Sequence, residues 1–288
     1  MNSIFIKKYI YLAGIFLSMI SCKKNETATP TSLPAQEWTN VSYGKDSAQK
    51  MDIYLPADRD TSSTKVIVLI HGGAWLEGDK KDFSEYISLL KNRLPDYAVF
   101  NINYRLATQG SNYFPTQEND VQSAIDFIYK NKKEYSVSDK FVLLGASAGG
   151  HLALLHAYKH KAPVGVKAVI SFFGPADLIA LYNSQSNTYY QFAFQTLVGG
   201  TPSGNVAAYQ QSSPSYFVSS NSCPTLLLQG GKDMLVSPSQ TEDLKAKLTA
   251  AGVPAELVFY PNEGHGWYGN TLNDSFDHIK NFLEKYLP

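Results

Sequence analysis

The strongest chemical signal in this sequence is a serine between glycines at the end of an apolar run. Residues 141–144 have the composition of a buried strand and lead directly into Gly145-Ala-Ser147-Ala-Gly149. Strong helix formers follow without a breaker, which predicts a helix. A G-x-S-x-G pattern between a strand and a helix is typical of a sharp turn that exposes a nucleophilic serine. We therefore predict that Ser147 is a nucleophile.

A serine hydroxyl needs a base to take its proton and an acid to orient that base. On this kind of turn, the acid and then the histidine are expected later in the chain, each on a loop after a strand. Asp233 follows the apolar run 225–229, and His265 follows the run 256–260. Glycines near both permit tight loops. The predicted catalytic residues are thus Ser147, Asp233 and His265.

The tetrahedral intermediate of acyl transfer carries an oxyanion that needs backbone N–H donors. One donor is expected from the residue after the nucleophile, Ala148. The others are expected from residues 70–75, Ile-His-Gly-Gly-Ala-Trp, here named the donor loop, because small residues let backbone amides approach a substrate. We predict an oxyanion hole of Gly73, Ala74 and Ala148, with His71 bracing the loop by hydrogen bonds.

Other polar residues are weaker candidates for chemistry. His156 and His160 are four apart on a predicted helix and could share a metal, but no nearby pair of carboxylates completes a site. We therefore predict no metal. Glu263 is too close in sequence to the predicted histidine to be its natural partner, Asp177 belongs to an irregular segment, and His278 falls in the last predicted helix.

Strands and helices alternate along most of the chain. The apolar and helical periodicities predict strands at 65–71, 97–104, 141–144, 166–174, 225–229 and 256–260, and helices at 82–94, 118–135, after Gly150, at 239–251 and at 274–286. Residues 41–44 and 50–56 predict an opening antiparallel hairpin. This alternation predicts an α/β fold with a parallel sheet covered by helices on both faces. We expect a single domain over residues 38–288.

Residues 177–221 interrupt this alternation and are rich in aromatic side chains. We expect a small helical insertion after the sixth strand. Its aromatics either pack a core of their own or line a pocket over the serine, because ligands bind at the carboxyl ends of strands in open α/β sheets. The sequence leaves both alternatives open.

The N-terminus predicts export. Residues 1–21 have a basic start at Lys7 and Lys8 and then an apolar stretch of the length of a signal peptide. Ser21-Cys22 at its end is similar to a bacterial lipobox, although Met19-Ile20 departs from the commoner form. We expect a lipid on Cys22, a Pro- and Thr-rich tether over residues 22–37, and a place in the bacterial cell envelope, at the outer membrane or cell surface. A conventional signal peptide with an incidental cysteine is the alternative.

Composition limits the partners. The 288 residues include 25 basic and 25 acidic side chains, so the formal net charge is zero. Because nucleic-acid-binding proteins usually show a basic face, a nucleic-acid partner is not expected. The second cysteine, Cys223, begins an apolar strand and is expected to be a small buried residue.

Several motifs together resemble a known group of enzymes. These are His71-Gly-Gly-Ala-Trp75, Tyr104-Arg-Leu106, Gly145-Ala-Ser-Ala-Gly149, Ser213-Pro214, Gly230-Gly-Lys-Asp233 and Gly264-His265-Gly. In this order they resemble the α/β-hydrolase esterases related to hormone-sensitive lipase and to bacterial feruloyl or acetyl esterases. The resemblance covers roughly residues 50–288 and implies an eight-stranded, mostly parallel sheet, no cofactor and hydrolysis of carboxylic esters through an acyl-enzyme. Ala74 stands where hormone-sensitive-lipase-like enzymes usually have a third glycine, and its methyl group is expected to narrow the acyl site.

The sequence therefore predicts a lipid-anchored serine carboxylesterase whose substrate is a small-molecule or carbohydrate ester, with acetyl and feruloyl groups as candidates by analogy. Amidases, including arylformamidases, and peptidases use the same machinery and are the alternative enzymes. Exopeptidases of this fold usually add a large propeller domain, for which the chain has no length. A binding protein that has lost its chemistry is the non-enzymatic alternative, but no member of the triad is missing.

Overall fold

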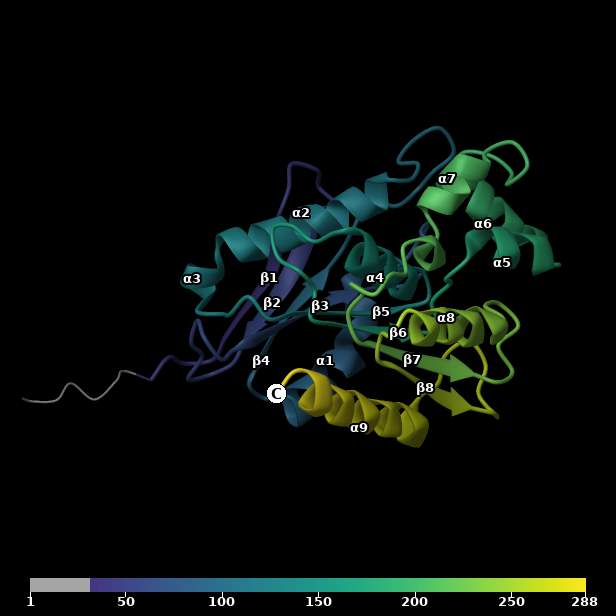
Figure 1. Ribbon diagram of the computed structural model, residues 1–288. Helices are drawn as coiled ribbons and strands as arrows, with labels where there is room; N and C mark the ends of the chain where they lie inside the picture. The colour runs from purple at the N-terminus through teal and green to yellow at the C-terminus, as the bar shows by residue number, and fades with distance from the viewer. Residues whose placement is uncertain (1–31) are drawn as a thin grey trace, which may run out of the picture. The chain divides into compact units, whose positions relative to one another are not determined.

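A computed structural model describes residues 32–288 of the chain, and Leu33–Pro288 form one compact unit. Its centre is a single sheet in the order β1-β2-β4-β3-β5-β6-β7-β8 (Figure 1). The strands are β1 (Gln36–Ser42), β2 (Lys50–Leu55), β3 (Lys65–Ile70), β4 (Tyr97–Ile102), β5 (Phe141–Ala146), β6 (Ala168–Phe172), β7 (Thr225–Gly230) and β8 (Ala255–Tyr260). The predicted opening hairpin is β1 and β2, which pair antiparallel. β2 is also antiparallel to β4, and the other neighbours are parallel.

The inner strands β3 to β7 are buried on both faces, which explains their continuous apolar sequences, whereas the edge strand β8 is partly exposed. Because side chains alternate along a strand, Val66, Val68 and Ile70 of β3 face one hydrophobic cluster, and Ile67 and Leu69 face the other. The predicted α/β fold with both faces covered is therefore confirmed.

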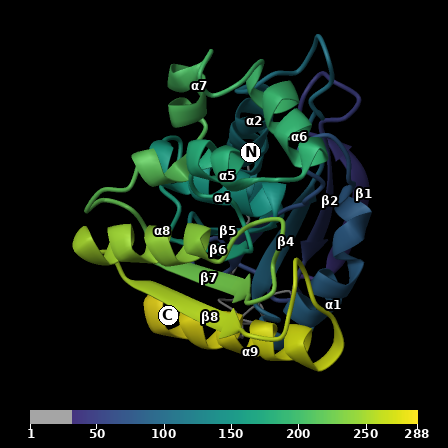
Figure 2. The same ribbon diagram turned by 90° about the vertical axis from the view of Figure 1, so that its right-hand side faces the viewer.

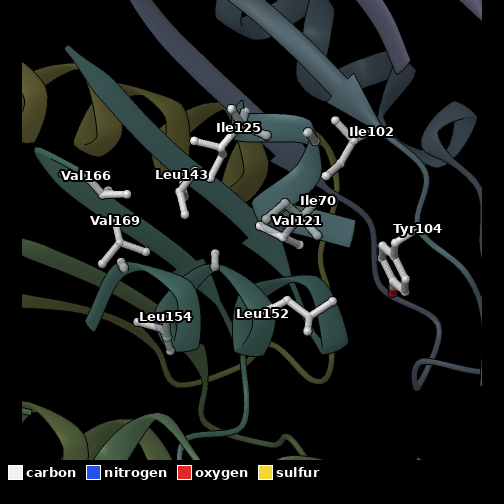
Figure 3. Packing of buried hydrophobic residues seen from close by; sticks show 14 of the residues in the cluster. Ile70, Ile102, Tyr104, Val121, Ile125, Leu143, Leu152, Leu154, Val166 and Val169 are labelled. Carbon is white, nitrogen blue, oxygen red and sulfur yellow. The ribbon is translucent and has the colours of Figure 1, made fainter. Parts of the chain in front are cut away.

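The helices divide between the two faces. One cluster includes apolar residues of α2 (Thr116–Lys130), α4 (Ala148–Lys159) and α8 (Ser239–Ala250). The other includes residues of α1 (Ser84–Arg93) and α9 (Gly269–Tyr286). Figure 3 shows part of the first cluster, with Leu143 and Val169 from the sheet, Val121 from α2 and Leu152 from α4. The helix α4, which directly follows Ser147, is thus packed against the sheet.

The predicted insertion consists of short helices between β6 and β7: α5 (Leu178–Ser184), α6 (Thr188–Val198), α7 (Val206–Gln211) and the 3-10 turn η2 (Pro214–Tyr216). They lie at the end of the sheet towards which the arrows of β7 and β8 point (Figures 1 and 2). The loops that follow the parallel strands meet at this same end of the sheet.

Several helix boundaries differ from the sequence expectation. The expected helix 82–94 begins as the 3-10 turn η1 (Lys80–Phe83), where Asp79 caps the backbone N–H of Lys81. The expected helix 118–135 is divided into α2 and the short α3 (Lys132–Tyr135). The last helix begins at Gly269, five residues before its expected start, because its first turn carries Leu272 into the core.

The N-terminal boundary also differs. The expected tether 22–37 reaches into β1, which begins at Gln36 and pairs with Leu55 of β2. Arg59 holds this entry to the domain through hydrogen bonds to the carbonyl of Pro34 and the side chain of Gln36. The expected signal peptide and Cys22 lie outside the described residues. Among the helices of residues 32–288, none combines the length and the hydropathy needed to cross a membrane.

Candidate active site

Ser147 lies on a strained turn between β5 and α4. Its φ of 53° and ψ of −120° are unusual for a residue with a side chain. A Cβ added to Gly145 would lie 2.2 Å from the carbonyl oxygen of Gly149, and one added to Gly149 would lie 1.8 Å from the carbonyl oxygen of Ile70. The two glycines of the motif are therefore required by backbone contact. The N–H of Ser147 donates to the carbonyl of Phe172 at 2.9 Å, which ties the turn to the end of β6.

Asp233 and His265 reach Ser147 from the loops after β7 and β8. Nδ1 of His265 lies 2.8 Å from Oδ2 of Asp233, and its Nε2 lies 2.9 Å from Oγ of Ser147. Because a carboxylate accepts only, Nδ1 carries the proton and Nε2 accepts from the serine hydroxyl. This chain of hydrogen bonds can take the hydroxyl proton when the serine attacks a carbonyl.

The carboxylate of Asp233 is held from several directions. Its side chain is fully buried. Oδ1 accepts from the backbone N–H groups of Leu235 and Val236, both at 2.9 Å, and Oδ2 also accepts from Nε2 of Gln229 at 3.1 Å. These partners fix the direction in which the carboxylate meets His265.

The loops that carry the acid and the histidine touch each other. A Cβ on Gly230 would lie 2.2 Å from the carbonyl oxygen of Gly264, and the N–H of Lys232 donates to the carbonyl of Glu263 at 2.8 Å. The glycine at the end of β7 therefore permits the approach of the histidine loop.

The donor loop lies beside the serine with its amides available. Gly73 has a φ of 104°, and a Cβ there would lie 2.0 Å from the carbonyl oxygen of Glu77. The carbonyl of Gly73 accepts from the N–H groups of Leu76 and Glu77, both at 3.0 Å. Within residues 32–288, the N–H groups of Gly73 and Ala74 have no hydrogen-bond partner. Gly73 and Ala74 line the cleft that Ser147 borders, and Ala148 follows Ser147 as the first residue of α4.

His71 braces the donor loop, as the sequence analysis expected. Its Nδ1 donates to the carbonyl of Gly72 at 2.7 Å, and its ring stacks on Tyr104 with centroids 4.3 Å apart. The hydroxyl of Tyr104 donates to the carbonyl of His71 at 3.0 Å. Burial lowers the pKa of His71, so this histidine remains neutral at neutral pH.

A second histidine, His151 of α4, joins this helix to the donor loop. Nε1–H of Trp75 donates to Nδ1 of His151 at 3.2 Å, and Nε2–H of His151 donates to the carbonyl of Ser212 at 2.5 Å. Burial lowers the pKa of His151 to about 4. No role for His151 is predicted from the sequence. The sequence does contain one indication of a role, because His151 is a polar residue within the apolar run that forms α4.

The space around Ser147 has two parts. An open cleft of about 220 Å³ lies between the donor loop, Phe173, Tyr189 and His265. A small pocket of about 20 Å³ also borders Ser147, and its other lining residues are Ala74, Trp75, Tyr190, Phe194, Leu235, Val236 and His265. Phe173, which packs against the His265 ring at 4.5 Å between centroids, was not singled out from the sequence. Its position could have indicated a role, because Phe173 directly follows β6, at the end of the sheet where the other site residues lie.

Both alternatives for the aromatics of the insertion hold, each for different residues. Tyr189, Tyr190 and Phe194 line the cleft or the pocket. Tyr209 is fully buried and packs edge-on against Tyr182 with centroids 6.1 Å apart, inside the insertion itself.

The weaker candidates from the sequence have partners other than Ser147. Asp177 caps α5 by accepting from the N–H groups of Ile179 and Ala180, and Glu263 accepts from Thr271. His160 pairs with Glu118 at 2.6 Å, and its ring stacks on His156. His278 is half exposed on α9.

Cys223 is buried, as expected, and burial raises the pKa of its thiol to about 12. In the described residues, no group of three or more histidine, cysteine or acidic side chains has the arrangement to hold a metal ion.

The sheet order, the strained serine turn and the Asp233–His265–Ser147 contacts define an α/β-hydrolase. The sequence of the chain agrees with this class. A family model described as BD-FAE matches residues 51–248, and the chain belongs to this family of α/β-hydrolase esterases.

Three individual similarities extend this result. The chain is 27% identical over 242 residues to "Esterase LipC" of Mycobacterium tuberculosis, covering 79% of this chain but only 59% of LipC. It is 30% identical over 224 residues to "Kynurenine formamidase" of Meyerozyma guilliermondii, covering 75% of this chain and 82% of that protein. Among solved structures it is similar to "Bifunctional GH43-CE" of Bacteroides eggerthii, with a TM-score of 0.74, 28% identity, and coverage of 88% of this chain and 38% of the other.

Proposed function

We propose that this protein is a serine carboxylesterase that works through an acyl-enzyme. The observation that supports it most directly is the continuous hydrogen-bonded series from Asp233 through His265 to Ser147. BD-FAE family membership and similarity to named esterases support the same chemistry.

In the proposed first step, Oγ of Ser147 bonds to the ester carbonyl carbon while Nε2 of His265 takes the hydroxyl proton. The N–H groups of Gly73, Ala74 and Ala148 stabilise the oxyanion, and Asp233 stabilises the protonated His265. The bond to the alcohol oxygen then breaks, and His265 gives its proton to that oxygen. In the second step, His265 takes a proton from water, whose oxygen bonds to the acyl carbon. The bond to Ser147 breaks, and Oγ regains its proton.

The alcohol side of the substrate is proposed to be a carbohydrate. Supporting this are the exposed ring of Tyr189, the ring of Phe173 and the carboxylate of Glu77, which all line the open cleft. Within the described residues, no cation or hydrogen-bond donor pairs with the Glu77 side chain, which leaves its oxygens available to sugar hydroxyls. The likeness to a protein described as bifunctional GH43-CE agrees with this choice.

The test is hydrolysis of p-nitrophenyl acetate by the wild-type protein and by Ser147→Ala, with both folds checked by circular dichroism. We expect turnover and fluorophosphonate labelling of wild type only. Retained turnover in a folded Ser147→Ala protein would refute the assignment. A wild-type protein that neither turns over esters nor takes the label would instead indicate the non-catalytic binding protein.

A formamidase is the second candidate, because the chain is 30% identical to a kynurenine formamidase and covers 82% of it. The same Ser147 chemistry would then cleave the C–N bond of an aryl formamide. Kinetics with N-formylkynurenine and p-nitrophenyl acetate, measured on the same preparation, separate the two. A kcat/KM that is higher for the formamide favours this candidate over the esterase.

We also propose that the protein is exported to the bacterial envelope and held there by a lipid on Cys22. The support is the basic and apolar sequence of residues 1–21 followed by Ser21-Cys22. Metabolic labelling of the full chain with an alkyne fatty acid tests it, with Cys22→Ser as the matched control. Equal labelling of the two proteins, or none in either, contradicts the anchor.

A further inference from the structure

The two spaces that meet at Ser147 differ in size and in access. The open cleft has about 220 Å³, and one of its walls, Tyr189, is 46% exposed. The small pocket has about 20 Å³, and its walls include Trp75, Phe194 and Val236, whose exposed fractions are 3%, 2% and 5%. Both spaces border Ser147, Ala74 and His265, so each can receive one side of a bound ester.

The volume of the small pocket limits what it can hold. A single water molecule needs about 10–15 Å³ of such space. The pocket therefore has room for a small group such as a methyl.

The walls of this pocket have little freedom to move. The Trp75 ring is held by its hydrogen bond to His151 and packs on Phe194 with centroids 5.7 Å apart. The backbone N–H of Val236 is bonded to Asp233, so moving this wall would disturb the acid behind His265. Close-packed walls of this kind resist the entry of even one extra methylene.

The order of the two chemical steps determines which side of the ester belongs in the small pocket. The acyl group stays on Ser147 through both steps. The alcohol has to leave between them, and water has to enter by the route that the alcohol vacated. The open cleft offers the wider route, since the walls of the small pocket include the buried side chains of Trp75, Phe194 and Val236.

From these observations we infer that the small pocket is an acyl site selective for acetyl groups, and that larger acyl groups such as feruloyl are excluded from it. This inference rests on the proposed esterase function and specifies its substrate. The methyl group of the acetyl lies against Trp75, Phe194 and Val236, and the alcohol lies in the cleft beside Tyr189 and Glu77. Ala74, whose methyl group is expected from the sequence to narrow the acyl site, also lines the small pocket.

The experiment is a pair of substrate series on the full chain. The first varies the acyl group, with p-nitrophenyl acetate, butyrate and octanoate, and methyl ferulate beside them. Because each extra methylene in a hydrophobic pocket changes kcat/KM by about 10- to 200-fold, we expect acetate to exceed butyrate by at least about 10-fold. The second varies the alcohol of acetate esters, from methyl to phenyl to acetylated xylo-oligosaccharide. We expect the larger alcohols to be accepted.

Two variants widen the proposed acyl pocket. Phe194→Ala removes its back wall, and Val236→Ala makes a smaller opening that leaves the backbone bond to Asp233 in place. Both are expected to reduce the acetate-to-butyrate ratio of kcat/KM by about 10-fold or more. Val236→Ala keeps the test valid if Phe194→Ala does not fold. Tyr216→Ala, at an exposed aromatic of η2 that lines neither space, is the matched control and is expected to retain the wild-type ratio.

The outcomes separate the inference from the proposed function. Turnover of butyrate or methyl ferulate equal to that of acetate leaves the esterase standing and overturns the acetyl site. Preference for methyl esters of long acids over acetates of large alcohols also overturns it, because the pocket would then hold the alcohol. Absence of turnover with every ester refutes the proposed function itself.

Discussion

Nε1–H of Trp75 donates a 3.2 Å hydrogen bond to Nδ1 of His151, and this contact joins the donor loop to the helix that follows Ser147. Trp75 and its neighbour Ala74 have positive φ values of 63° and 49°, a conformation that side chains disfavour. His151 is four residues after the serine and is itself bonded to Ser212. The contact therefore keeps a strained loop at a constant distance from the proposed nucleophile.

Trp75→Phe keeps an aromatic ring beside Phe194 but removes the donor. We expect kcat to fall by about 10-fold with little change in KM, less than the about 100- to 1,000-fold loss for an oxyanion donor itself. Steady-state kinetics with p-nitrophenyl acetate measure kcat and KM separately. Trp38→Phe, on the exposed side of β1, is the matched control. An unchanged kcat in Trp75→Phe would mean that the bond to His151 does not position the loop.

Asp233→Asn tests the orienting acid. An amide of the same shape cannot hold the charge that stabilises protonated His265, and we expect kcat to fall by about 10,000-fold. Asp177→Asn provides the control, because Asp177 only caps α5. Similar kinetic losses in both variants would point to a general effect on folding and contradict the assigned role.

Gly73→Ala tests the shape of the donor loop. The added Cβ would lie 2.0 Å from the carbonyl oxygen of Glu77, so the loop has to move. If it carries an oxyanion donor, kcat should fall by about 100-fold. Gly110→Ala is matched to it, since Gly110 also has a positive φ but no atom lies within 4 Å of an added Cβ. That variant should cost about 1–2 kcal/mol of stability and leave kcat unchanged.

Glu77→Gln tests carbohydrate recognition in the cleft. If the Glu77 carboxylate accepts hydrogen bonds from sugar hydroxyls, its loss should raise KM for acetylated xylo-oligosaccharides by about 10-fold, the equivalent of one charged hydrogen bond. The KM for p-nitrophenyl acetate, which has no such hydroxyls, serves as the internal control. Parallel changes with both substrates would show that Glu77 acts on the site rather than on the sugar.

Two buried histidines should make stability depend on pH. Burial lowers the pKa of His151 to about 4, and burial with His160 and Lys161 nearby lowers that of His156 to about 3. Below pH 6.5 the unfolded chain binds protons that the folded protein does not. The free energy of unfolding therefore falls with decreasing pH by about 1.4 kcal/mol per unit for each group, until the folded pKa is reached.

Urea denaturation between pH 4.5 and 7 measures this slope. In His156→Leu the slope of the free energy of unfolding against pH should decrease by the contribution of one buried histidine. His278→Leu, at a half-exposed position on α9, should retain the wild-type slope. A His156→Leu slope equal to that of wild type would mean that His156 is already protonated in the folded protein.

Much of the fold and the site could be predicted because the relevant signals are local. The apolar runs of β3 and β5 and the helical spacing of α2 identify the parallel sheet without reference to distant residues. The predicted order of Ser147, Asp233 and His265 follows from their places after strands. Parallel strands carry their following loops to one edge, so residues 118 and 32 apart in sequence were expected to meet there.

The sequence by itself therefore determined the class of fold and which residues could carry the chemistry. Only the tertiary structure decided how the donor loop is held, which insertion aromatics face Ser147, and how small the pocket that borders it is. The bond between Trp75 and His151 and the wall formed by Phe194 depend on how α4 and α6 pack over the sheet. Such contacts join segments with no shared periodicity. They follow from packing geometry, which local sequence patterns do not encode.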